Sequence, residues 1–100
     1  KKSALFVCGM GNNGADGIVA ARLLHGAYTV SLYLPYELKS ELARLQLERS
    51  KKVGVTIVND LIDADVYVDA LFGAGLNRAL DAFTCKLREK LNAKQGYKMA

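Results

Sequence analysis

Apolar positions along the chain alternate between short unbroken runs and stretches with helical spacing. The runs are rich in β-branched and aromatic residues, which is typical of buried strands. They predict strands at 3–9, 28–34, 55–58 and 65–72, and the start of another strand in 96–100. Between the runs, apolar residues recur every three or four positions, which predicts helices over 16–25, 37–52 and 79–92.

The predicted helices have recognisable ends and apolar stripes. Asp16 is a good N-cap residue for the first helix, and Gly26 suits its end. The stripe of the second helix consists of Leu38, Leu42 and Leu45. The last helix has the clearest stripe, made of Leu80, Phe83, Leu87 and Leu91.

Strands that alternate with helices indicate right-handed βαβ units and a parallel sheet. The predicted fold class is therefore α/β, with a Rossmann-like three-layer α/β/α architecture and a mainly parallel sheet. Three or four strands are fewer than the five or six of doubly wound folds. We therefore expect the 100 residues to be a fragment of a larger domain.

Composition narrows the function classes. Of 100 residues, 51% are apolar and 24% are charged, as in a single small globular unit. No apolar run approaches the ~20 residues that span a bilayer, and no signal-peptide cleavage site follows the N-terminus. Cys8 and Cys85 lie outside metal-binding spacings and are predicted to be buried, reduced thiols. These features favour a cytoplasmic location without a membrane partner.

The formal net charge of +4 comes largely from two basic stretches, 39–52 and 86–98. Glutamates alternate with the lysines and arginines there, which is typical of a solvated helix face. An anion- or nucleic-acid-binding surface is the alternative, but aromatic residues are not interleaved with a basic stripe. We expect no nucleic-acid partner. His25, the only histidine, follows a predicted helix and is expected to have no catalytic role.

The most informative segment is the glycine loop CGMGNNGADG after the first predicted strand. Gly9, Gly11 and Gly14 have the G-x-G-x-x-G spacing of dinucleotide-binding loops, which alone is a weak signal. Such loops also need an acidic residue near the end of the second strand to hold the ribose. Here that strand ends in residues 33–36 and the first acid is Glu37. The loop therefore differs from that of a standard dehydrogenase.

The polar residues of the loop suit hydroxyls, a carboxamide or a hard cation. Asp16 at a helix start would compete with a pyrophosphate for the positive end of the helix dipole. Asn12 and Asn13 supply amide donors and carbonyl acceptors. The alternative interpretation is a plain turn in which Asp16 only caps its helix.

A second glycine-rich loop, DALFGAGLNR at 69–78, follows the strand predicted at 65–72. If that strand lies beside the first one, Asp69 and the turn at 73–75 face the first loop across a crevice. An aspartate at the end of an apolar strand is costly to bury unless it is paired, solvated or bound to a cation. Two such loops together predict a binding site.

The segments GMGNNGADGIVAARLL and VDALFGAGLNR resemble the hallmarks of the NAD(P)H-hydrate epimerase family, the YjeF N-terminal domain. The family pattern is G-x-G-N-N-G-G-D-G-x-x-A-A-R-x-L, followed about fifty residues later by D-A-x-F-G-T-G-x-x-R. Order and spacing agree over about residues 4–92. The resemblance implies that 1–100 is a partial epimerase domain, without the family's N-terminal helices and C-terminal strands.

The resemblance implies an isomerase of nicotinamide cofactor repair. It would interconvert the R and S forms of hydrated NADH or NADPH (NADHX and NADPHX), with an ADP- or ATP-dependent dehydratase, fused or separate, as partner. It also implies a homodimer and a potassium ion bound by Asn13 and Asp69. The implied substrate-binding residues are Asn12, Asn13, Gly14, Ala15, Asp16, Gly73, Ala74, Gly75, Leu76, Asn77, Arg78 and Ala79.

Two departures from the family pattern affect this interpretation. Ala15 stands where the family usually has glycine, and we expect the added methyl group to be tolerated. The family's D-x-P-S-G motif, which supplies a carboxylate at the reacting centre, is not within these residues. The main acid–base residue is therefore expected beyond residue 100, with Asp16 assisting.

Two other function classes stay open. One is a non-catalytic scaffold of the same fold that binds a nucleotide or mediates dimerisation, as in relatives whose motifs have degenerated. The other is a nucleotide-binding domain of unrelated chemistry. The intact polar residues of both loops favour the enzyme over the scaffold, and the missing ribose acid argues against the third class.

Overall fold

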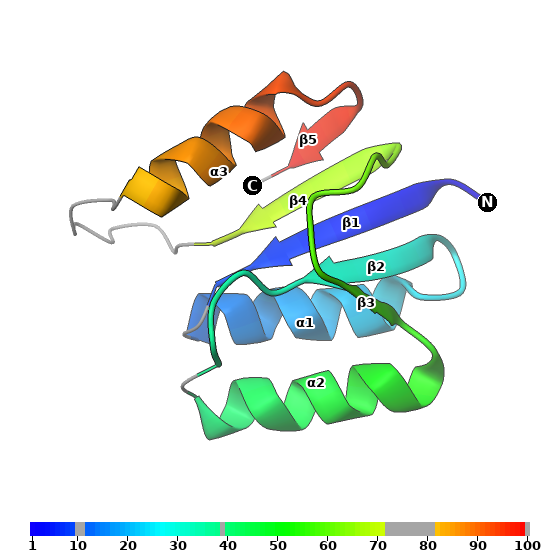
Figure 1. Cartoon of the computed structure of the whole chain (residues 1–100). Coiled ribbons are helices and arrows are strands. Elements are labelled where there is room, and N and C mark those ends of the chain that lie inside the picture. The colour runs from blue at the N-terminus through cyan, green and yellow to red at the C-terminus, as the bar shows by residue number, and fades with distance from the viewer. Residues whose placement is uncertain (10–11, 39, 72–81, 100) are drawn as a thin grey trace.

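The structure is a computed structural model that describes residues 1–9, 12–38, 40–71 and 82–99 (Figure 1). Strands and helices alternate, except that two strands follow one another directly. In chain order the elements are β1 (Ser3–Cys8), α1 (Asn12–Leu24), β2 (Thr29–Tyr33), α2 (Glu41–Val53), β3 (Thr56–Val58), β4 (Val66–Ala70), α3 (Ala82–Ala93) and β5 (Tyr97–Met99).

The strands form one parallel sheet in the order β3-β2-β1-β4-β5. β1 is central, and its residues pair with β2 on one side and with β4 on the other. This arrangement confirms the α/β class. It also places β4 beside β1, an arrangement that the sequence left as a condition for the two loops to face each other. It is the strand order of a doubly wound fold, whose binding crevice lies where the chain direction across the sheet reverses.

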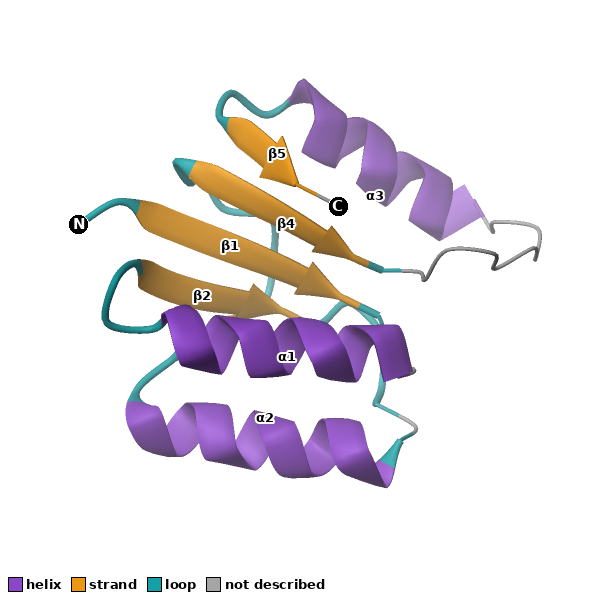
Figure 2. Cartoon of the chain, turned by 180° about the vertical axis from the view of Figure 1, so that it is seen from behind, coloured by secondary structure: helices purple, strands orange, loops and turns teal. Residues whose placement is uncertain are grey.

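The sheet is the middle of three layers. α1 and α2 cover one face, while α3 and the crossover at 59–65, which joins β3 to β4, lie on the other (Figures 1 and 2). β1 is buried on both sides, with Phe6 in the core beneath α1 and Leu5 and Val7 in the core beneath α3. The unbroken apolar run of β1 reflects this double burial. No helix in the described part of the chain is long and apolar enough to cross a membrane.

The predicted start of the first helix was wrong. α1 begins at Asn12 rather than at Asp16, so Asp16 is an exposed residue of the second turn and does not cap the helix. The helix begins early because its first turn packs closely on the sheet. Gly14, Gly17 and Ile18 are all buried, at the spacing of one helical face. The two glycines on this face, Gly14 and Gly17, are the signal of the early start that a search for large apolar residues overlooks.

The predicted stripe of the second helix was also wrong. Ser40 caps α2, and its hydroxyl accepts a hydrogen bond from the Ala43 N–H at 3.3 Å. Leu38 is buried but precedes the helix, whereas Leu42 and Leu45 are about half exposed, at 50% and 47%. The face of α2 that packs on α1 has smaller and more polar side chains than the predicted leucine stripe. Its buried residues are Ala43, Gln46 and Ser50.

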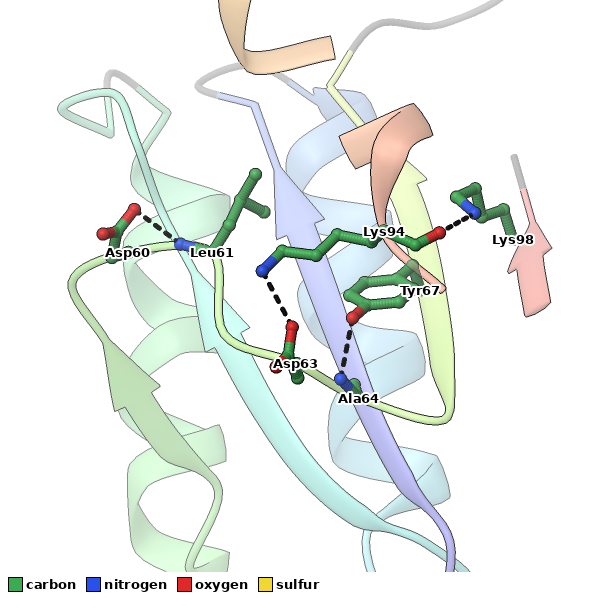
Figure 3. Close-up of polar contacts among 7 residues, drawn as sticks. All are labelled: Asp60, Leu61, Asp63, Ala64, Tyr67, Lys94 and Lys98. Atoms are coloured by element: carbon green, nitrogen blue, oxygen red, sulfur yellow. Dashed lines mark hydrogen bonds and ion pairs between the residues drawn. The ribbon is translucent and has the colours of Figure 1, made fainter. Parts of the chain in front are cut away.

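Polar contacts hold the crossover against β4 and the turn after α3 (Figure 3). The Tyr67 hydroxyl, in the core beneath α3, accepts a hydrogen bond from the Ala64 N–H at 2.8 Å. Lys94, in the turn after α3, pairs with Asp63 at 2.8 Å, and this hydrogen bond raises the pKa of the lysine. The crossover therefore serves as part of the layer that α3 forms.

The basic stretch at 86–98 is less solvated than its sequence predicts. Besides the Lys94 pair, Lys98 lies over the Tyr67 ring, 6.0 Å from its centroid, and donates to the Lys94 carbonyl (Figure 3). Arg88 forms an ion pair within the candidate site described below. Several of these cations are therefore bound to the protein's own groups.

Candidate functional site

The candidate site lies where β1 and β4 end side by side. Beyond β1 the chain enters α1 on one face of the sheet, and beyond β4 it continues toward α3 on the other. The Gly9 N–H donates to the Ala70 carbonyl at 2.9 Å, which extends the ladder by one bond past the paired residues. The two motif loops therefore leave the sheet from adjacent points, which meets the condition stated for them in the sequence analysis.

The glycines of the first loop are required by the protein's own packing. A Cβ atom on Gly9 would lie 2.1 Å from the Leu71 carbonyl oxygen, and one on Gly14 would lie 1.9 Å from the Gly9 carbonyl oxygen. Both neighbours are backbone atoms, which cannot move aside cheaply. The G-x-G-x-x-G spacing thus brings β1, β4 and α1 into close contact, whatever ligand the loop binds.

The polar segment of the first loop forms the first turns of α1. Asp16 is exposed, whereas Ala15 is 1% exposed and belongs to the core beneath α1. The extra methyl of Ala15 therefore packs into the core, and any ligand contact of this residue would involve its backbone. The side chains of Asn12 and Asn13 are outside the described part of the structure, as is Gly11.

The second loop is described only at its beginning. Its predicted substrate-binding residues, Gly73, Ala74, Gly75, Leu76, Asn77, Arg78 and Ala79, lie outside the described residues. Asp69 is described and lies in β4, in register with Val7 of β1. Both side chains point to the α3 face, because Leu5, Val7 and Tyr67 share the core on that side.

Within the described part of the chain, two groups lie beside the carboxylate of Asp69. One oxygen, Oδ1, accepts a hydrogen bond from the Leu71 N–H at 3.1 Å. The other, Oδ2, lies 3.6 Å from Nη2 of Arg88 on α3. The carboxylate is 23% exposed, so it is neither fully buried nor freely solvated. A negative charge in this position needs a cationic neighbour, and the fold provides one.

Arg88 is the residue of this site that the sequence interpretation missed. It stood in a basic stretch with the pattern of a solvated face, and that pattern contains no sign of its partner. The available signal is its position in α3, one residue after Leu87 and three before Leu91, both of which are buried against the sheet. A long side chain at that point reaches the sheet face.

Asp69 supplies one hard oxygen ligand of the kind that potassium accepts. In this structure the Leu71 N–H donates to Oδ1 and the Arg88 guanidinium lies beside Oδ2, so both oxygens already have a neighbour. The described residues contain no group of three or more His, Cys, Asp or Glu side chains that could hold a metal ion.

Cys8 adjoins the site but is not suited to nucleophilic chemistry. It is buried at the end of β1, and burial raises the pKa of its thiol to about 12. At neutral pH the side chain is therefore a neutral thiol that packs in the core. This confirms its predicted burial, while the side chain of Cys85 lies outside the described residues.

Comparison with known proteins identifies the family. The family described as "YjeF-related protein N-terminus" matches residues 1–100. The chain belongs to this family. The NAD(P)H-hydrate epimerase of Aspergillus fumigatus is 46% identical to the chain over 72% of the chain's length, and the match covers 32% of that protein. The NAD(P)H-hydrate epimerase of Rhodobacter capsulatus is 42% identical over 82% of the chain, and the match covers 42% of that protein.

Two further matches extend the comparison. A protein of Archaeoglobus fulgidus named bifunctional NAD(P)H-hydrate repair enzyme Nnr is 38% identical over 92% of the chain, which covers 20% of that protein. The crystal structure of yeast ynu0, YNL200c, superposes with a TM-score of 0.80 at 20% identity, over 98% of this chain and 47% of that one. The YjeF-related chain thus spans less than half the length of these relatives, and the likeness to ynu0 concerns the fold.

Proposed function

We propose that the YjeF-related chain is part of an NAD(P)H-hydrate epimerase, an isomerase that interconverts the R and S forms of hydrated NADH and NADPH. The observation that supports it best is the junction of the two motif loops. Gly9 and Ala70 are hydrogen-bonded at the ends of adjacent parallel strands, so both loops leave the sheet from adjacent points. The names of the relatives from Aspergillus fumigatus and Rhodobacter capsulatus point to the same activity.

In this proposal the first turns of α1 bind the hydrated nicotinamide nucleotide. Asn12, Asn13 and the exposed Asp16 offer donors and acceptors to its hydroxyl and carboxamide groups, while Gly14 and Ala15 contribute backbone. The segment 73–79 wraps the phosphate-bearing side of the nucleotide. A carboxylate beyond residue 100 acts as the main acid–base residue, and Asp16 assists it by orienting the hydroxyl.

Asp69 and Asn13 would hold a potassium ion at the crevice. The ion would supply a fixed positive charge beside the bound nucleotide. Asp69 contributes a hard oxygen ligand whose position is fixed by the strand and by the Leu71 N–H.

The proposed partner is an ADP- or ATP-dependent dehydratase that consumes one epimer. The Archaeoglobus fulgidus relative, named a bifunctional repair enzyme, supports a fused arrangement in some members of the family. A homodimer and a cytoplasmic location stay predictions from the sequence.

An epimerase assay with the full-length protein tests the proposal. NADPHX depleted of its S form is incubated with enzyme in potassium or sodium buffer, and the return of the S form is followed by chromatography. We expect acceleration over the spontaneous rate, reduced by at least about tenfold in Asp69→Asn. Glu48→Gln, which removes a charge from the exposed side of α2, is the matched control and should keep full activity.

Two other outcomes would contradict the proposal. Binding of NADPHX without any acceleration would identify a nucleotide-binding scaffold. Failure to bind NADPHX at all would show that the loops recognise a different ligand.

A further inference from the structure

The outer face of α2 carries apolar side chains that no described element covers. Leu42, Leu45 and Val53 are 50%, 47% and 48% exposed. Together with Arg49 they recur at steps of three and four positions, so they form one stripe along the helix. α2 is the outermost helix of its layer in the described part of the chain (Figures 1 and 2). Single exposed leucines are ordinary, but an aligned set of three apolar side chains is typical of a contact surface.

The fold itself uses other faces of α2. Gln46 accepts a hydrogen bond from Arg22 of α1 at 3.4 Å, and the Ser50 hydroxyl donates to the Ile18 carbonyl at 3.5 Å. Leu47 packs against the core beneath α1. The stripe is therefore not needed to hold α2 in place, and its side chains are available to a partner.

Two charged residues flank the stripe at its opposite ends. Glu41 lies in the first turn of α2 and Lys52 in the last, and both are exposed. They are about three full turns apart, so they lie on the same side of the stripe. Neither side chain has an ion-pair partner among the described residues. A second copy of α2, packed antiparallel on the first, would bring Lys52 of the partner subunit beside Glu41.

The apolar positions have the same symmetry as this charged pair. In the antiparallel arrangement Leu42 lies opposite Val53 of the partner subunit, and Leu45 lies opposite Arg49 of the partner subunit. Each of these pairs, like the charged pair, is centred within one position of Leu47, so a single two-fold axis satisfies all of them. The opposed helix macrodipoles attract each other as well. A partner with one sign of charge would match only one end of the stripe, whereas a second copy matches both.

We propose that the outer stripe of α2 is a self-association surface, on which two copies of the chain pack their α2 helices antiparallel about a two-fold axis. This assigns a surface to the homodimer that the sequence predicts, and it does not depend on the epimerase activity. An interface centred on one helix pair is at the low end of interface sizes. The dissociation constant should therefore be on the order of 10 µM.

Sedimentation velocity of the full-length protein, over about 1–200 µM, measures this dissociation constant. Leu45→Lys places a lysine on the stripe, opposite Arg49 of the partner subunit, and should raise the constant by at least about thirtyfold. Ile62→Lys is the matched control, because Ile62 is 40% exposed in the crossover on the other face of the sheet. The control adds the same charge and should change the constant by less than about twofold.

Exchanging the flanking charges tests the antiparallel arrangement. Glu41→Lys and Lys52→Glu should each raise the dissociation constant by about five- to tenfold, because each change turns two attractive pairs of the dimer into repulsive ones. The double variant should return to within about threefold of the unmodified protein. An effect of net charge alone would differ in sign between the two single variants, since one adds positive charge and the other removes it. Circular dichroism checks folding, and if Glu41→Lys misfolds, Lys52→Glu decides.

Three results would overturn the inference. A dimer that Leu45→Lys leaves intact would associate through another surface. A protein that stays monomeric over the whole range, with a melting temperature lowered by Leu45→Lys but not by Ile62→Lys, would cover the stripe with another of its own segments. Effects of opposite sign in Glu41→Lys and Lys52→Glu would reject the antiparallel pairing. None of these results bears on the epimerase assay, so the proposed function is tested separately.

Discussion

Replacing Gly17 by alanine tests how tightly α1 is packed on the sheet. Gly17 lies inside α1 and is buried above the ends of β1 and β4. A Cβ atom there would lie 2.7 Å from the Ala70 Cβ and 2.8 Å from the Cys8 Sγ. These separations are about 1 Å shorter than an ordinary van der Waals contact. The substitution therefore has two opposing effects on stability. Alanine has the higher helix propensity, whereas its methyl group clashes with the sheet.

The two effects have different magnitudes. Alanine is favoured over glycine in a helix interior by about 0.8–1.0 kcal/mol. Overpacking a well-packed core typically costs about 1–3 kcal/mol. The cost should lie near the upper end here, because the contacts are with a Cβ atom and a short thiol held by central strands. We expect Gly17→Ala to lower the free energy of unfolding by about 1–2 kcal/mol, the difference between these terms.

Urea denaturation of the full-length protein, followed by circular dichroism, measures this difference. The matched comparison is Gly17→Ala in a Cys8→Ala background, because Cys8→Ala removes the sulfur atom that the new methyl group would meet. A double-mutant cycle should then give a favourable coupling of about 1 kcal/mol. Stabilisation by Gly17→Ala, as helix propensity alone predicts, would refute the close packing of α1 on β1 and β4. A coupling near zero would refute the contact with Cys8.

Two further predictions concern the core. Tyr67→Phe removes the hydrogen-bond acceptor of the Ala64 N–H, so it should lower the free energy of unfolding by about 1 kcal/mol and speed hydrogen exchange at that amide. Tyr97→Phe, at an exposed position, is the control and should change neither quantity. An unchanged exchange rate in Tyr67→Phe would contradict the hydrogen bond. Because burial raises the pKa of Cys8 from 9.0 to about 12, folding favours the neutral thiol, and this contribution is complete below pH 9.0 and lost as pH rises toward 12. Alkylation of native Cys8 by iodoacetamide at pH 8 should be about a thousandfold slower than in urea, and comparable rates would contradict its burial.

The sheet could be predicted because its strands are buried on both faces. A central parallel strand needs apolar residues at every position, so β1 and its neighbours are visible as unbroken runs. The position of β4 beside β1 could not be derived from the sequence, which left it as a condition; the pairing in the structure supplies it. In these strands the unbroken apolar run in the sequence matches the burial of both faces in the fold.

The helices were harder to predict because their buried faces are built from small and polar residues. In α2 the positions against α1 are Ala43, Gln46 and Ser50, while Leu42 and Leu45 face away. A stripe of leucines normally marks the core face, and here it does not. Gln46 accepts from Arg22 of α1 at 3.4 Å, so a polar contact occupies a position where the pattern predicts an apolar one.

Asp69 could be selected from the sequence, but its ion pair with Arg88 could not. A carboxylate at the end of an apolar strand stands out because its burial is costly. An arginine in a basic helix does not, because its long side chain reaches several directions and most such residues are solvated. Only the distance between α3 and β4 decides between these possibilities, and that distance depends on packing across the whole layer.

The structure also changes which residues of the motif are evidence for function. Gly9 and Gly14 are required by backbone contacts of the fold itself, so a non-catalytic scaffold would retain them as an enzyme would. The exposed Asp16 and the partly buried Asp69 differ, because neither is needed to close the packing. A scaffold released from catalysis could replace Asp69 and Arg88 together by apolar residues at little cost, or even with a gain in stability. The presence of Asp69 in β4, one residue before the junction of the two loops, is therefore stronger support for a binding site than the glycine spacing that first draws attention to it.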